Sequence, residues 1–180
     1  MKLSQHLLNL KEIGKQKYMQ MFGGLYEHSP WIAETVWDEI QSENSIDIET
    51  LAKKLKSTVD NATQQQKLDL LCAHPELAGK AATQGTLTVD STDEQSRARL
   101  DLCSTEEFEK FHKLNAIYNK KFNFPFIMAV RNSSRVEILD AFESRVENDK
   151  EQEFKTALEQ VHKIALLRLH AVITAESKKV

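Results

Sequence analysis

Helix-breaking residues are scarce in this chain, and their scarcity constrains the fold more than any other feature. The 180 residues include only 5 glycines and 3 prolines. Between these residues, apolar positions recur every three or four residues, which is the period of an amphipathic helix. We therefore predict an all-α protein, with residues 1–180 forming a single-domain helical bundle of about eight helices.

Several short patterns mark where helices begin. Ser29 before Pro30 is predicted to open one helix as its N-cap and first-turn proline, and Asp47 is predicted to open the next. Capping boxes, in which a serine precedes a glutamate by three residues, are predicted at Ser91 with Glu94, Ser104 with Glu107 and Ser134 with Glu137. Apolar stripes predict the extent of the helix that Ser104 opens, at about 105–122, and one further helix at about 150–176.

One segment and one side chain depart from this helical pattern. Phe124 precedes a proline and is pushed out of the helical region, and the apolar residues that follow it favour a buried, non-helical segment, Phe124–Val130. The amides of this segment either bind a ligand or find partners within the protein. In the last predicted helix, Arg168 falls on the apolar stripe with Val161 and Ala165. Two explanations stay open: the guanidinium reaches water or a structural carboxylate, or it binds the carboxylate of a substrate.

His74 is the residue best suited to proton transfer. It precedes Pro75 and should therefore end a helix. A histidine at a helix end has a structural explanation, because it favours the negative end of the helix dipole. It also has a chemical one, because imidazole gains and loses a proton near neutral pH. The residues alone leave both explanations open.

No metal site is predicted. Glu109 with His112 and Glu159 with His162 match the Glu-x-x-His pattern of di-iron helix bundles. At about 100° per residue, however, these pairs lie away from the apolar stripes of their helices. Metal ligands in a bundle must point inward, so the pattern does not indicate a metal centre here.

Charge and composition narrow the partners and the compartment. The net charge is -3 and the basic residues are scattered, which argues against nucleic acid. There is no apolar run of the ~20 residues that a membrane helix needs, and no export signal, so no membrane partner is expected. Cys72 and Cys103 suit a reducing compartment as thiols, and we expect a cytoplasmic protein.

Five segments resemble one known enzyme family. They are FGGLYEHSPWIAE at 22–34, HPELAGK at 74–80, STDEQ at 91–95, YNKKFNFPFIMAVR at 118–131 and KIALLRL at 163–169. In this order they resemble OHCU decarboxylase, where OHCU stands for 2-oxo-4-hydroxy-4-carboxy-5-ureidoimidazoline. The resemblance spans nearly the whole chain.

The resemblance implies a function. Members of the family are helical carboxy-lyases, usually homodimeric, that need no metal and no organic cofactor. They convert OHCU, the last intermediate of urate breakdown in purine degradation, into (S)-allantoin. The resemblance therefore implies the same decarboxylation here, with stereospecific protonation of the product and a homodimer as the assembly.

The resemblance also implies roles for individual residues. His74, Glu94 and Arg168 correspond to the catalytic set, with His74 as the proton donor and Arg168 as the substrate anchor. The residues implied to contact the substrate are Pro75, Ser91, Thr92, Asp93, Glu94, Gln95, Phe126, Ile127, Met128, Ala129 and Val130.

The chain departs from the family pattern in two places. Ala98, Arg99, Leu100 and Asp101 stand where Ala, Gly, Leu and Asp are usual, and Leu166 stands where an arginine is common. Two alternatives to the enzyme stay open. One is a related protein that binds a ureide without turnover, and the other is a helical interaction protein.

Overall fold

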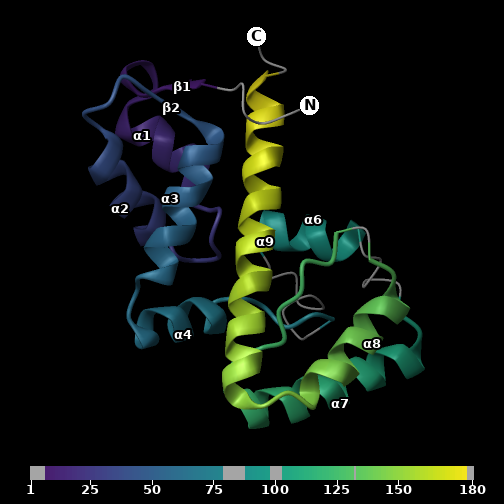
Figure 1. Ribbon diagram of the computed structural model, residues 1–180. Coiled ribbons are helices and arrows are strands. Elements are labelled where there is room, and N and C mark those ends of the chain that lie inside the picture. Colours follow the sequence, from purple (N-terminus) through teal and green to yellow (C-terminus); the bar gives the residue numbers. More distant parts are fainter. Residues whose placement is uncertain (1–6, 79–87, 98–102, 132, 178–180) are drawn as a thin grey trace. The chain divides into compact units, whose positions relative to one another are not determined.

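Helices make up most of the structure (Figure 1), a computed structural model that describes residues 7–78, 88–97, 103–131 and 133–177. Within these residues the helices are α1 (Leu10–Phe22), α2 (Trp31–Ile40), α3 (Ile48–Asp60), α4 (Gln64–Cys72), α6 (Val89–Arg97), α7 (Thr105–Phe122), α8 (Arg135–Val146) and α9 (Lys150–Ser177). The prediction of an all-α protein with about eight helices is confirmed. No helix in the described ranges is long and apolar enough to cross a membrane.

A short antiparallel strand pair lies outside that prediction. Strands β1 (Leu7–Asn9) and β2 (Ser45–Asp47) pair with Leu8 opposite Ile46. Each strand has only three residues, which is too few to show an alternating pattern in the sequence. The pair connects the start of the chain to the residues that lead into α3.

Three of the predicted helix starts are confirmed. The Asp47 carboxylate accepts a hydrogen bond from the Thr50 amide at 2.9 Å and caps α3. Capping boxes with both reciprocal hydrogen bonds open α7 at Ser104 and α8 at Ser134. In each case the bonded groups are three residues apart, so the sequence contains the whole interaction.

The other two predicted starts are wrong by one and by three residues. Helix α2 begins at Trp31, and its N-cap is Pro30, without a side-chain cap. Helix α6 begins at Val89, so Ser91 lies inside it rather than at its start. The Ser91 amide donates to the Thr88 hydroxyl at 3.3 Å, so the threonine supplies the cap that Ser91 was predicted to supply.

The chain forms two compact units. The terminal unit comprises Met1–Leu70 with His162–Val180, and the central unit comprises Leu71–Val161. In the terminal unit α2 packs against α1 and α3 (Figure 1), with buried Val36 and Leu51 among the core residues. The single domain predicted for residues 1–180 stays a prediction.

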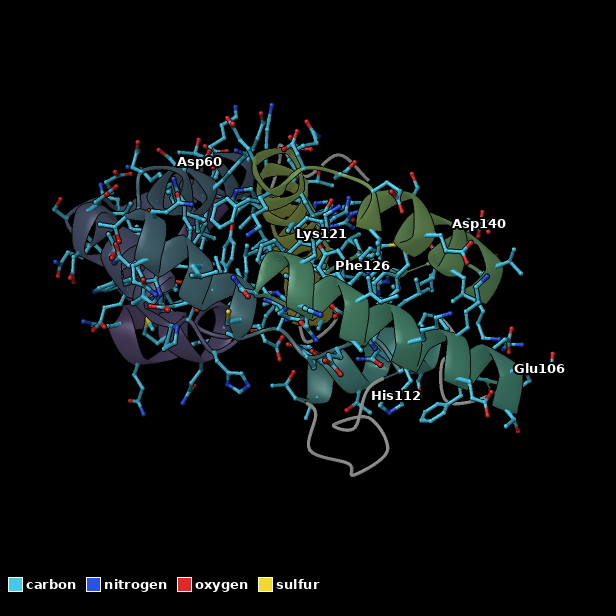
Figure 2. All side chains as sticks on the ribbon, turned by 90° about the horizontal axis from the view of Figure 1, so that it is seen from below. Asp60, Glu106, His112, Lys121, Phe126 and Asp140 are labelled. Carbon is cyan, nitrogen blue, oxygen red and sulfur yellow. The ribbon has the colours of Figure 1, made fainter. Side chains whose placement is uncertain are left out.

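The central unit has an aromatic core between α7 and α8. The rings of Phe126 and Phe142 stack with centroids 3.9 Å apart, and Tyr118 meets both rings edge-on. Figure 2 shows Phe126 among the side chains that these helices enclose, and His112 on the outer side of α7.

The prediction that the segment is not helical is confirmed. Helix α7 ends at Phe122, its C-cap Asn123 has a left-handed φ of 63°, and residues 125–130 form neither helix nor strand. Phe124, Phe126 and Ile127 are buried. Because the chain is neither helical nor paired in a sheet here, its backbone groups need partners elsewhere.

Candidate active site

His74 lies in a turn that directly follows α4. The residue is only 7% exposed, and its backbone amide donates to the Leu71 carbonyl at 3.2 Å. Pro75 follows and is half-buried. The predicted position of His74 at a helix end is confirmed within two residues, because α4 ends at Cys72.

Side chains from α6 and α7 hold the backbone that follows His74. The Gln95 side-chain oxygen accepts from the Ala78 amide at 3.2 Å, and its nitrogen donates to the Glu76 carbonyl at 3.4 Å. Asn115 donates to the Leu77 carbonyl at 3.0 Å. Ala78 has a φ of 50°, a left-handed conformation that costs energy for a residue other than glycine. These hydrogen bonds fix the turn beside the histidine.

The predicted substrate residues of α6 divide between two faces of the helix. Ser91 and Gln95, which are one turn apart, are buried, and Glu94 is half-buried. Thr92 and Asp93 are exposed, and the Thr92 hydroxyl donates to the Thr88 carbonyl at 2.9 Å. Gln95 is also bound to the turn after His74, so the structure brings this part of the predicted set together.

Neighbouring helices bind the backbone of the extended segment. The Ala129 amide donates to the Gln160 side-chain oxygen at 3.1 Å, and the Ile127 carbonyl accepts from Arg145 at 2.7 Å. Met128 is half-buried, whereas Val130 is buried. The protein itself therefore occupies the Ala129 amide, which the sequence analysis leaves open to a ligand.

Arg145 also belongs to a buried hydrogen-bond network that the sequence analysis does not predict. Its guanidinium lies 4.4 Å from the Phe126 ring centre and donates twice to the Glu153 carboxylate. The same carboxylate, which is 0% exposed, accepts from the Tyr118 hydroxyl and from Asn148. Burial and then the bond to Glu153 raise the pKa of Tyr118 well above its usual value.

Arg168 lies on α9 in the terminal unit, where it has a carboxylate partner. Its side chain is 6% exposed, and Nη1 lies 2.7 Å from Oε2 of Glu27, whose side chain is 1% exposed. The predicted inward orientation of Arg168 is confirmed, and a structural carboxylate accompanies it. Leu166, the departure on the same helix, is partly exposed.

Sequence reasoning misses Glu27, although the demand for an anion near Arg168 is a signal for it. Glu27 lies between α1 and α2, where no helical periodicity marks it as buried. His74 belongs to the central unit and Arg168 to the terminal unit. Residues 98–101, which include Arg99, lie outside the described residues.

The two Glu-x-x-His pairs do not gather into a metal site. Glu109, His112 and Glu159 are exposed. Both ring nitrogens of His162 have protein partners, since Nδ1 lies 3.0 Å from the Tyr26 hydroxyl and Nε2 lies 3.1 Å from Asp60. Among the residues with described positions, no group of three or more His, Cys, Asp or Glu is arranged to hold a metal ion.

A comparison with known families decides where the chain belongs. The sequence model for OHCU decarboxylase matches residues 11–170. The chain belongs to the OHCU decarboxylase family. The resemblance found in the sequence is thereby confirmed, and the match covers both units of the fold.

Two proteins named as OHCU decarboxylases and one solved structure are similar to this chain. The decarboxylase of Halalkalicoccus jeotgali is 40% identical over 161 residues, 89% of this chain and 88% of the relative. That of Haloferax volcanii is 36% identical over 174 residues, 95% of this chain and 99% of the relative. The crystal structure of an (S)-allantoin synthase superposes with a TM-score of 0.72 at 36% identity and covers 92% of this chain. This chain spans 54% of that crystallised chain.

Proposed function

We propose that this protein decarboxylates OHCU to (S)-allantoin in urate degradation. The family match over residues 11–170 carries the proposal. The burial of His74 and Arg168, the two groups best suited to proton transfer and to anion binding, supports it. The protein is a carboxy-lyase, and OHCU is its substrate.

His74 is the proton donor in this proposal. Loss of carbon dioxide breaks a carbon–carbon bond, and the adjacent C=N group of the ring takes up the electron pair. The carbon of that C=N group, which bears the ureido group, is then protonated, and the hydroxyl on the carbon that lost carbon dioxide gives up its proton to become the carbonyl of allantoin. An acid fixed on one side of the ureido-bearing carbon gives one enantiomer. The hydrogen bonds from Gln95 and Asn115 to the turn after His74 would hold such an acid in place.

Arg168 binds an anionic oxygen of the substrate in this proposal, since a guanidinium pairs well with carboxylates. Glu94 and Gln95 hold the hydroxyl and ureido groups, together with Ser91, Thr92 and Asp93. The remaining contacts come from Pro75 and from the segment Phe126–Val130. Burial supports this assignment for some of these residues more than for others. Ser91 and Phe126 are buried, and Glu94 and Met128 are half-buried, which suits a substrate site. Thr92 and Asp93 are exposed, so their assignment has less support.

We also propose a cytoplasmic homodimer that acts without metal or organic cofactor. The resemblance to the family supports the dimer and the independence from cofactors. Cys72 and Cys103 are thiols, which suits a reducing compartment. Light scattering after size-exclusion chromatography measures the mass of the assembly, and a mass of one chain would contradict the dimer.

The experiment that tests the activity follows the stereochemistry of the product. OHCU is generated from urate by the two preceding enzymes, and circular dichroism then records (S)-allantoin after this protein is added. We expect rapid formation of one enantiomer, which His74→Ala abolishes. His112→Ala is the matched control, because His112 is exposed on the outer side of α7 (Figure 2).

Each alternative predicts a different result. A protein that binds the ureide without turnover would leave only the slow racemic background, yet it would bind (S)-allantoin saturably in calorimetry. A helical interaction protein would show neither turnover nor binding. If wild type is active and His74→Ala is equally active, the proposed decarboxylase activity stands and the proposed role of His74 is wrong.

A further inference from the structure

We propose that Glu27 is a positioning residue, which holds the Arg168 guanidinium in the orientation that binds substrate. The inference rests on the proposed function, because it assigns to Glu27 the task of preparing the substrate anchor. The ion pair between the two side chains is buried on both sides, with 6% of the arginine and 1% of the glutamate side chain exposed.

The charge and shape of the two groups explain why one contact has this effect. A buried guanidinium without a counter-charge is unstable, so the Glu27 carboxylate balances the charge of Arg168 and holds its side chain in place. The guanidinium is planar with five N–H donors, so anchoring one nitrogen fixes the plane in which the others point. Nη1 lies 2.7 Å from Glu27 and also donates to the Gly24 carbonyl at 3.5 Å, and both partners come from one short segment.

That segment, residues 23–29, is itself tightly held between α1 and α2. The Leu25 amide donates to the Phe22 carbonyl at 3.2 Å, and the Ser29 amide donates to the Tyr26 carbonyl at 3.1 Å. The chain approaches α1 so closely that a Cβ at Gly23 would lie 2.6 Å from the Met19 carbonyl oxygen. A carboxylate on such a backbone has little freedom to move.

A second contact ties the same segment to α9. The hydroxyl of Tyr26, the residue before Glu27, lies 3.0 Å from Nδ1 of His162, and Nε2 of that histidine lies 3.1 Å from Asp60. Tyr26 is buried, and its edge-on ring contact with His162 adds to the hydrogen bond. The segment is therefore held against α9 at two residues, His162 and Arg168.

The test compares kcat and KM for OHCU in wild type, Glu27→Gln and Glu27→Asp. Glutamine keeps the size and removes the charge, whereas aspartate keeps the charge on a shorter side chain. We expect Glu27→Gln to raise KM by about 10- to 100-fold with little change in kcat, as for a misplaced binding group. Glu27→Asp should recover part of the loss, because its charge is retained.

Two further variants separate positioning from stability. Ile40→Val removes one buried methyl group from α2 without touching the ion pair, and it should leave KM unchanged even where it lowers the melting temperature. In an Arg168→Gln background, Glu27→Gln should have no further effect on kcat/KM, since its role acts through the arginine. If Glu27 had only a structural role, Glu27→Gln would lower kcat/KM by the same factor in the Arg168→Gln background as in wild type.

The outcomes distinguish the two proposals. Wild type that makes no (S)-allantoin above background overturns the proposed function and this inference with it. If wild type is active and the KM of Glu27→Gln lies within about twofold of the wild-type KM, only the role of Glu27 is overturned. If far-UV circular dichroism shows that Glu27→Gln is unfolded, Glu27→Asp decides, and an unchanged KM there overturns the inference.

Discussion

Replacing Glu153 with glutamine should destabilise the central unit, because its carboxylate is the shared acceptor of a buried network. The side chain is fully buried and accepts hydrogen bonds from Tyr118, from two nitrogens of Arg145 and from Asn148. Glutamine has nearly the same volume, so the change removes the charge and one acceptor without leaving a cavity.

The expected magnitude follows from the charge left behind. The Arg145 side chain is 12% exposed, and its guanidinium would lose its counter-charge in a mostly buried position. Breaking a buried ion pair by removing one partner costs about 3–5 kcal/mol. At about 2–4 °C per kcal/mol for a chain of this size, the melting temperature should fall by about 6–20 °C.

Urea unfolding followed by far-UV circular dichroism measures this loss, with calorimetry for the melting temperature. Glu49→Gln is the matched control, because Glu49 pairs with Lys53 at 2.7 Å on the exposed face of α3. That change should cost no more than about 0.5 kcal/mol. A loss below about 1 kcal/mol for Glu153→Gln would refute the view that the buried pair needs both charges.

Three further predictions concern a capping box, a helix cap and the turn beside His74. Hydrogen bonds from the Ser104 amide and then from Arg135 lower the pKa of Glu107 below its ordinary value of 4.5. The ionised Glu107 carboxylate therefore stabilises the fold above that value, and this stabilisation is lost as pH falls through the pKa of the folded state. Between about pH 6 and about pH 3, urea unfolding should show a larger loss of stability for wild type than for Glu107→Gln. Equal losses would contradict this. Asp47→Ala should lower the free energy of unfolding by about 0.5–2 kcal/mol, because it removes the cap of α3. Asp47→Ser, which keeps a capping side chain, should retain most of that free energy in the same assay. Gln95→Leu should lower kcat for OHCU by about tenfold, because it loosens the turn beside His74 and removes a proposed substrate contact, whereas Ser96→Ala, on the exposed face of α6, should not. An unchanged kcat in Gln95→Leu would contradict both roles of Gln95.

Local patterns predicted the helices well and their exact starts less well. Ser104 and Ser134 were identifiable as caps because each bonds to an amide and a carboxylate three residues away. Ser91 misled the prediction because Thr88, an equally good capping residue, precedes it by almost one turn. Choosing between two such residues depends on packing around the helix start, which periodicity does not describe.

The candidate site was only partly predictable. His74 and Arg168 stood out because imidazole transfers protons near neutral pH and because an arginine lay on an apolar stripe. Two buried acids did not stand out. Glu27, the partner of Arg168, and Glu153, the partner of Arg145, look like ordinary surface acids in the sequence, yet each is buried against its arginine. Gln95 was assigned to the substrate, and the structure shows it binding the turn after His74 as well.

The sequence by itself determined the helical class, the extended segment Phe124–Val130 and the residue types available for chemistry. These follow from interactions over a few residues: helical periodicity, capping bonds and the steric effect of proline. Only the tertiary structure decided that Glu27 faces Arg168 and that Glu153 faces Arg145. Ion pairing depends on distance in space, and the fold brings together charges that are far apart along the chain.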